Sequence, residues 1–220
     1  MLNEVKASAT VVDRAISGQG LSGTWQESPL VGADALMKSH QSGSPKAFRL
    51  TERPFLELVN VRGDTRDAAF VKAVQNVIGC VPPEKANTVA RGNGYTMLWL
   101  GPDEWLVHSD AAHDAARPAP LEAKLRDAFA GQFSAAVDIG SGYTVLEIDG
   151  PKTREVLSRG CPLDLHPKVF GLGQCAQSHF FKASITLTPL GGDRCEIIVR
   201  RSFADYFVKI MLDAAEPLLS

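Results

Sequence analysis

Apolar and polar residues follow the same order twice along this chain of 220 residues. In each copy an apolar strand runs into a turn that contains glycine, a helix comes next, and a β-hairpin follows. The strand-to-turn segments are Leu58-Val59-Asn60-Val61-Arg62-Gly63-Asp64 and Leu146-Glu147-Ile148-Asp149-Gly150-Pro151, and the helices end at Gly79-Cys80-Val81-Pro82 and Gly160-Cys161-Pro162. This duplication predicts an α+β fold made of two related strand–helix–hairpin halves with antiparallel-rich sheets.

The first half opens with a strand from Phe55 to Val61, indicated by its strand-like apolar pattern. A helix follows Asp64, a favourable residue at a helix N-terminus, and ends at Gly79 as a left-handed cap. Its predicted buried face consists of Phe70, Val71, Val74, Val77 and Ile78. A hairpin of residues 95–100 and 104–108, turning at Gly101-Pro102-Asp103, and a short helix over residues 121–130 complete this half.

The second half opens with strands over residues 135–139 and 143–148. Pro151 stands where a first helical residue is expected, and this helix runs to Arg159. Further strands are predicted over residues 176–181, 185–190 and 196–199, with a turn at Gly191-Gly192-Asp193. The last helix starts at Ser202, with Asp205 at capping-box spacing. Its predicted buried face holds Phe203, Phe207 and Ile210.

Residues 1–47 differ in composition from the rest, because they are rich in Ser, Gly and Ala. A disordered tail seldom carries a Trp and paired aliphatic residues, yet Trp25 and Leu36-Met37 lie here. The segment is therefore an arm that packs either on its own domain or on a partner. The expected organisation is an N-terminal arm (1–47), a first half (48–133) and a second half (134–220) of one domain.

Composition excludes several classes of protein. The formal net charge of −2, with both signs interspersed, implies neither a nucleic-acid partner nor a membrane partner. No apolar run approaches the roughly 20 residues that span a bilayer, and the N-terminus lacks a secretory pattern. The four cysteines form no Cys-x-x-Cys pair, which is typical of reduced thiols. A soluble, cytoplasmic protein is expected.

Motif searches find no nucleotide loop and no metal site. Gly140-Ser141-Gly142 lacks the third glycine and the following helix of a dinucleotide fingerprint, so a turn is the better interpretation. None of the five histidines forms an i, i+4 pair, and no cysteine or carboxylate stands at metal-ligand spacing. We therefore predict no catalytic, cofactor-binding or metal-binding residue.

A loop with Cys161, Asp164 and His166 is the one candidate for chemistry. It could hold a Cys–His nucleophile, or be a rigid turn whose Asp and His satisfy backbone groups. The second interpretation is favoured, because the equivalent loop of the first half keeps Gly-Cys and Pro without Asp or His. Of Trp99 and Trp105, which flank the hairpin turn, one is expected in the core, and an exposed one would anchor an interface. The interface or loop candidates are Trp25, Trp105, Cys161, Asp164 and His166.

Several segments, taken in order, resemble the gamma subunit of heterotetrameric sarcosine oxidase over residues 48–210. In the first half these are Pro54-Phe55-Leu56, Val59-Asn60-Val61-Arg62-Gly63-Asp64, Asn87-Thr88 and the hairpin from Leu98 to Val107. In the second half they are Gly160-Cys161-Pro162-Leu163-Asp164-Leu165-His166-Pro167, Gln174-Cys175-Ala176-Gln177 and Val199-Arg200-Arg201-Ser202-Phe203-Ala204. No single segment decides the match.

The resemblance implies a fold like the folate-binding domain of the glycine-cleavage aminomethyltransferase. It also implies a complex with alpha, beta and delta subunits that demethylates sarcosine to glycine. The one-carbon unit passes to tetrahydrofolate or leaves as formaldehyde, and hydrogen peroxide forms. FAD, FMN, NAD, tetrahydrofolate and zinc belong to the partner subunits, and the gamma subunit supplies no catalytic or cofactor residue that could be carried over.

Three alternatives remain open. One is the equivalent subunit of N-methylglutamate dehydrogenase, whose substrate would be decided in another chain. Another is a stand-alone folate-dependent one-carbon protein. That class carries a further barrel domain or a Lys-Gly-Cys-Tyr-x-Gly-Gln-Glu signature, to which Arg159-Gly160-Cys161-Pro162 is the nearest fragment. The third is a cysteine enzyme built on Cys161 and His166.

Overall fold

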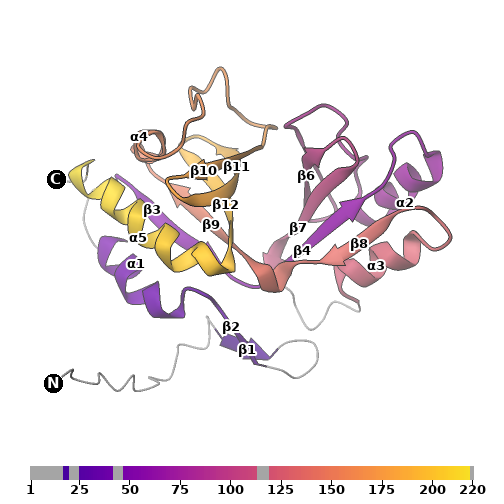
Figure 1. Ribbon diagram of the computed structural model, residues 1–220, viewed down its shortest axis with the longest axis horizontal. Coiled ribbons are helices and arrows are strands. Elements are labelled where there is room, and N and C mark those ends of the chain that lie inside the picture. Colours follow the sequence, from indigo (N-terminus) through magenta and orange to yellow (C-terminus); the bar gives the residue numbers. More distant parts are fainter. Residues whose placement is uncertain (1–16, 20–24, 42–46, 113–118, 219–220) are drawn as a thin grey trace.

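The computed structural model describes residues 17–19, 25–41, 47–112 and 119–218. Two five-stranded sheets meet near the middle of the molecule, and each carries helices on its outer side (Figure 1). All strand pairings of the described residues are antiparallel. The observed architecture is the predicted α+β fold of two related halves.

The first sheet has the strand order β5-β6-β7-β4-β8 and is covered by two helices. Its strands are β4 (Leu56–Arg62), β5 (Val89–Gly92), β6 (Tyr95–Gly101), β7 (Glu104–Ala112) and β8 (Ala135–Asp138). The helices α2 (Ala68–Ile78) and α3 (Leu121–Ala128) bury their apolar faces against it. At the aromatic centre of this core, the ring centroid of Phe70 lies 5.6 Å from that of Trp105 and 5.4 Å from that of Phe129.

The second sheet has the order β10-β11-β12-β9-β3 and is covered by three helices. Its strands are β3 (Arg49–Arg53), β9 (Tyr143–Asp149), β10 (Ala176–Phe180), β11 (Ala183–Gly191) and β12 (Arg194–Arg200). The helices are α1 (Asp34–Gln41), α4 (Thr153–Ser158) and α5 (Ala204–Ala215). Short 3₁₀ turns are η1 (Val31–Ala33), η2 (Gly140–Gly142), η3 (Arg201–Phe203) and η4 (Glu216–Leu218), and β1 (Ser17–Gln19) pairs with β2 (Trp25–Glu27).

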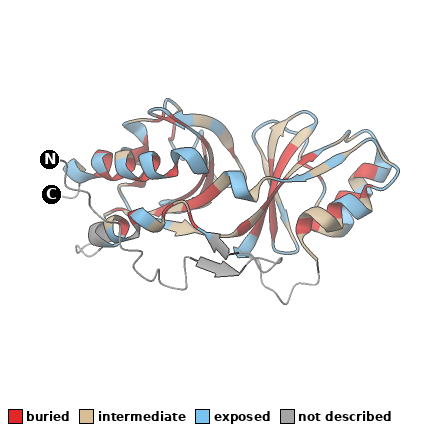
Figure 2. Ribbon diagram, turned by 60° about the horizontal axis from the view of Figure 1, so that its bottom comes forward, coloured by how far each residue is buried: buried red, intermediate tan, exposed pale blue. Residues whose placement is uncertain are grey.

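A third apolar cluster joins the two sheets through their helix-free faces. Side chains alternate between the two faces of a strand. Where one residue points into a helix-covered core, the next residue along the strand therefore points into the space between the sheets. Leu58, Leu98 and Leu106 of the first sheet meet Val145 and Ile198 of the second in this cluster. The buried stretches run through the interior of both halves (Figure 2). The two halves are therefore held face to face by apolar contact.

Each sheet also takes a strand from across the expected boundary between residues 133 and 134. Strand β3 precedes the first sheet along the chain but pairs with β9, where Leu50 lies opposite Ile148. Strand β8 follows residue 133 but pairs with β4, where Val61 lies opposite Ala136. Because of this exchange, the chain passes from one sheet to the other between β3 and β4 and again between β8 and β9. The division of residues 48–220 at residue 133 stays a prediction.

Part of the N-terminal arm packs on its own chain. Leu30, Ala33 and Met37 are buried in the core of the second half, beside α5. For residues 30–37 the structure thus selects packing on the same domain. Trp25 lies in β2, but its side chain, like residues 1–16, 20–24 and 42–46, is outside the described part, so a partner contact there stays a prediction.

Local turn and cap signals correctly placed two hairpins and a helix end. Gly79 adopts φ +81° and its N–H binds the carbonyl of Gln75, as a left-handed cap requires. The β11–β12 turn contains Gly191 and Gly192 at φ +95° and +58°, values that glycine adopts at low cost. The β6–β7 hairpin turns at Pro102 and Asp103, next to a register shift in its ladder.

Three predicted helix starts were wrong, because each of these helices begins two or more residues later. Asp64 binds the backbone N–H of Arg66, and α2 is capped instead by Asp67, which accepts from Ala69 N at 2.8 Å. Pro151 lies in a turn before α4, which is closed by the hydrogen bond from the N–H of Thr153 to the carbonyl of Gly150.

The start of the last helix is the third correction. Residues 201–203 form a 3₁₀ turn, so α5 begins at Ala204 without a side-chain cap. Asp205 pairs with Lys209 instead of capping. Phe203, predicted on the buried face, is 40% exposed, while Phe207 is fully buried and Ile210 packs partly against the core.

Replacing Asp67 by Ala is expected to lower the free energy of unfolding by about 1 kcal/mol, because the first turn of α2 loses its side-chain acceptor. Urea denaturation measures the change. Asp64→Ala is the matched control, since Asp64 pairs with exposed Arg66 and does not cap the helix. An Asp64 variant that loses more stability than the Asp67 variant would contradict the observed helix start.

Candidate functional site

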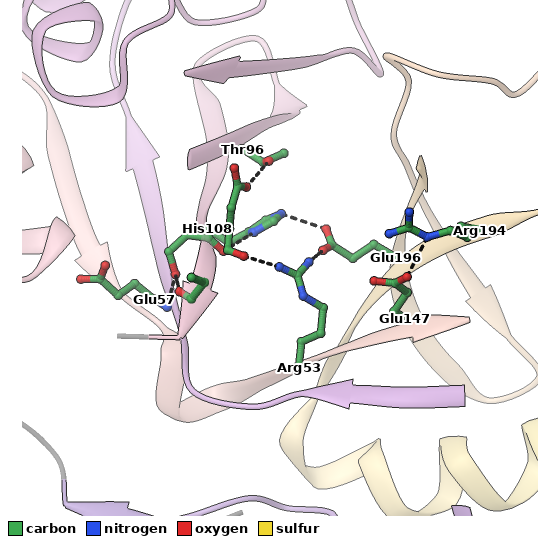
Figure 3. Close-up of polar contacts among 10 residues, drawn as sticks. Arg53, Glu57, Thr96, His108, Glu147, Arg194 and Glu196 are labelled. Carbon is green, nitrogen blue, oxygen red and sulfur yellow. Dashed lines mark hydrogen bonds and ion pairs between the residues drawn. The ribbon is translucent and has the colours of Figure 1, made fainter. Parts of the chain in front are cut away.

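A cleft of about 270 Å³ opens between the two sheets, beside the apolar cluster that joins them. The first sheet contributes residues of β5, β6 and β7, and the second contributes residues of β3, β9, β11 and β12. The lining residues are Arg53, Arg91, Thr96, His108, Asp110, Glu147, Leu190, Arg194 and Glu196. Charged side chains of both halves therefore face each other across the cleft (Figure 3).

A buried ion network lies at the floor of this cleft and connects the halves. Nε2 of His108 is 2.9 Å from Oε1 of Glu196, and both side chains are only 2% exposed. The guanidinium of Arg53 donates to the other carboxylate oxygen of Glu196 at 2.6 Å and to the carbonyl of Asp110 at 2.6 Å. One carboxylate of β12 thus binds a histidine of β7 and an arginine of β3 (Figure 3).

The network sets the charges of its members. Burial alone would lower the pKa of His108, but the hydrogen bond and negative charge of Glu196, with help from the carbonyl of Ser109, raise it above its ordinary value. Burial would raise the pKa of Glu196, but His108 and the charges of Arg53 and Arg91 lower it. Both shifts favour the charged pair, a protonated His108 beside an ionised Glu196.

Two further polar contacts complete the walls. Thr96 donates a hydrogen bond to the carboxylate of Asp110 at 2.9 Å. Nε of Arg194 donates to Oε1 of Glu147 at 2.8 Å, and this pair is more exposed than the one at the floor. The cleft can therefore hold charge on both of its walls.

The buried pair predicts a pH-dependent stability. A raised pKa of His108 means that its contribution is fully present below the ordinary value of 6.5 and is lost as the pH rises through the folded-state value. The lowered pKa of Glu196 gives a contribution that is present above 4.5 and lost as the pH falls through its folded-state value. The stability difference between wild type and His108→Gln should shrink between pH 6 and pH 9 in urea denaturation.

The exposed His166 supplies the control for this measurement, because its ring makes no ion pair with any side chain in the described ranges. His166→Gln should not reproduce the trend. A difference for His108→Gln that stays constant or grows over this range would show that the pKa of His108 is not raised in the folded protein.

Trp105 is a core residue. It is fully buried, its ring packs against Phe70, and its Nε1 donates to the carbonyl of Pro83 at 2.9 Å. Trp99 is partly buried and packs against the same core. Trp105 therefore has no exposed surface with which to anchor an interface.

The structure places Cys161, Asp164 and His166 in one loop but does not join them as a catalytic pair. The Cys161 thiol is buried and lies 3.6 Å from the hydroxyl of Ser178. Asp164 accepts from the backbone N–H of His166, and the His166 ring accepts from the backbone N–H of Lys168. Their contacts are those of a structural turn.

The remaining thiols are poor nucleophiles, because Cys175 and Cys195 are buried and Cys80 is partly buried. Burial raises the pKa of Cys175 and of Cys195 to about 11 and also raises the pKa of Cys80.

Within the described ranges no three His, Cys, Asp or Glu side chains are grouped as metal ligands require. No helix in the same part of the chain has the length and apolar character needed to cross a membrane.

Sequence reasoning missed the residues of the cleft. His108 is the last residue of one predicted strand and Glu196 the first of another, but the sequence alone indicates no ion-pair partner for either. A signal was present, because Glu196 stands inside the apolar run Cys195-Glu196-Ile197-Ile198-Val199. A charged residue within a buried strand needs a counter-charge, although the sequence does not say which one.

Comparison with known proteins adds the family. A sequence model described as "Sarcosine oxidase, gamma subunit family" matches residues 62–216. The chain belongs to this gamma subunit family. Its relatives include sarcosine oxidase subunit gamma of Corynebacterium sp. (strain P-1), which is 30% identical over 189 residues, covering 86% of this chain and 88% of that protein. The subunit gamma of Arthrobacter sp. is 29% identical over 183 residues, covering 83% and 85%.

Two solved structures share the fold of this chain. A chain of heterotetrameric sarcosine oxidase from Corynebacterium sp. U-96 has a TM-score of 0.79 and 26% identity, covering 89% of this chain and 97% of that chain. The glycine cleavage aminomethyltransferase T of Bartonella henselae has a TM-score of 0.60 and 15% identity, covering 89% of this chain and 53% of that chain. The second match shows the fold alone and confirms the predicted likeness to the aminomethyltransferase scaffold.

Proposed function

We propose that this chain is the accessory gamma subunit of a heterotetrameric sarcosine oxidase and has no active site of its own. The main support for this proposal is the similarity to sarcosine oxidase subunit gamma, which extends over 88% of the length of one relative. The complex would demethylate sarcosine oxidatively to glycine, with formaldehyde or 5,10-methylenetetrahydrofolate and hydrogen peroxide as the other products.

The proposed partners are the alpha, beta and delta subunits, and FAD, FMN, NAD, tetrahydrofolate and zinc would be bound by them. Support comes from the likeness to a chain of a heterotetrameric enzyme, which 89% of this chain matches. In this proposal the chain has a structural role in the complex. Its two halves are firmly joined, which suits a scaffold subunit.

The geometry of the described residues is consistent with such a role. The two sheets are joined by an apolar cluster, by the buried pair of His108 and Glu196, and by Arg53. A bridge between Thr88 and Gln174 connects the long loop of the second half to the first half. These contacts fix the relative position of the halves, which a subunit that presents one surface to several partners requires.

Co-expression with the genes that encode the neighbouring subunits tests the proposal. A tag on this chain should recover three further polypeptides with flavin absorbance, and the assembly should turn over sarcosine. With the tag on a partner subunit instead, omitting only this chain should reduce the recovery of the assembly, and adding it back should restore recovery. The isolated chain should leave sarcosine unchanged, and turnover by this chain alone would overturn the proposal.

Two further measurements, one of turnover and one of binding, distinguish the alternative functions. Turnover of N-methylglutamate in preference to sarcosine by the same assembly would assign the chain to N-methylglutamate dehydrogenase. Titration of the isolated chain with tetrahydrofolate tests the stand-alone alternative, because a dissociation constant near 1 μM, about −8 kcal/mol, would favour a folate protein.

A further inference from the structure

The mouth of the cleft carries two arginines with unused hydrogen-bond donors. Arg91, on the edge strand β5, makes no side-chain hydrogen bond or close ion pair within the described ranges. Its positive charge helps to lower the pKa of Glu196. Arg194 uses Nε for Glu147, and the structure assigns no partner to its two Nη groups among the residues it describes. In Figure 3 the Arg194 guanidinium points from the second sheet toward Glu196 and the cleft.

The charges that line the cleft are unevenly paired. Three arginines (Arg53, Arg91 and Arg194) and His108, whose pKa is raised, face three carboxylates, those of Asp110, Glu147 and Glu196. Glu196 is shared by two of the cations, and Glu147 by a third. Arg91 is the cation left over, while Asp110 is held by the hydroxyl of Thr96.

We propose that this cleft binds one small monocarboxylate, held by Arg91 and by the Nη groups of Arg194. The planar fork of a guanidinium matches the two oxygens of a carboxylate, which favours this group over a compact halide. A space of about 270 Å³ lies just below the range of roughly 300–1,000 Å³ for larger ligands, so the ligand is small. Leu190 supplies an apolar wall for its carbon part.

The same walls limit the charge of the ligand. Asp110 and Glu147 stand in the lining, so a second negative charge would meet two carboxylates. A dianion such as phosphate at pH 8 is therefore disfavoured relative to a monocarboxylate. The proposal concerns only this chain and does not depend on its role as an oxidase subunit.

Ligand-observed NMR of the full chain with acetate, at constant ionic strength kept with sodium chloride, tests the site. Saturable binding in the millimolar range is expected. Arg91→Gln and Arg194→Gln should each raise the dissociation constant at least fivefold, and Arg91→Lys should fall between Arg91→Gln and wild type, because it keeps the charge but not the fork. Phosphate at pH 8 should not displace acetate.

Arg126→Gln is the matched control, because Arg126 is an exposed arginine of α3 in an ion pair with Glu122 and lies outside the cleft. It should leave the dissociation constant unchanged. Binding that does not saturate, equal affinity in both cleft variants and wild type, or equal weakening by Arg126→Gln would overturn the proposal. Displacement of acetate by phosphate at equal concentration would overturn the assignment to a monocarboxylate.

Discussion

Replacing Glu196 by Gln is expected to lower the free energy of unfolding by about 3–5 kcal/mol, because removal of one partner leaves buried charge without compensation. Glu196 is 2% exposed and is the shared counter-charge of His108 and Arg53. The amide keeps the size of the side chain, so the loss reports charge and not a cavity. Urea denaturation at pH 6 measures the change.

Glu147→Gln is the matched control for this experiment. Glu147 lies directly opposite Glu196 on the neighbouring strand and also binds an arginine, but its side chain is 22% exposed. Solvent screens such a pair, so the expected loss is about 0–1 kcal/mol. Where Glu196→Gln does not fold, His108→Gln gives the test through the other member of the pair. Equal small losses at Glu196 and at Glu147 would contradict the buried network.

Replacing Trp105 by Ala is expected to cost about 3–5 kcal/mol of stability in the chain by itself. The ring is fully buried against Phe70, and its N–H donates to the carbonyl of Pro83. Removing it leaves a cavity in the first core and an acceptor without its donor. Thermal and urea unfolding of the isolated chain measure the loss.

Trp105→Phe separates the two contributions, because it keeps an aromatic ring but loses the N–H donor. It is expected to cost about 1 kcal/mol from the lost hydrogen bond, plus a smaller packing loss. A Trp105→Ala chain of wild-type stability that fails to join partner subunits would show instead that this residue acts at an interface.

Several local elements could be predicted because their signals lie within a few residues of each other. The apolar face of α2 and its glycine cap follow from helical spacing and from one residue that tolerates positive φ. The helix starts were less certain, because more than one side chain could serve. Asp64 and Asp67 are both good N-terminal residues, and the choice was made by Arg66, which binds the first of them.

The cleft could not be predicted in the same way. Arg53 and Glu196 are 143 positions apart, and no local pattern relates them. His108 and Glu196 each occupy the helix-free face of a different sheet, so their distance depends on how the two sheets pack. Sequence alternation indicates which face a residue takes but not what lies opposite that face.

The sequence by itself determined the duplicated order of strand, helix and hairpin, the two tight hairpin turns and the resemblance to the gamma subunit family. The tertiary structure alone decided that β3 joins the second sheet and β8 the first, that Trp105 is buried, and that three charged residues of distant strands share one buried network. The physical reason is that turns and caps depend on the backbone preferences of neighbouring residues. Strand partners and buried ion pairs depend on which distant faces are brought together when the two apolar sheet faces leave water.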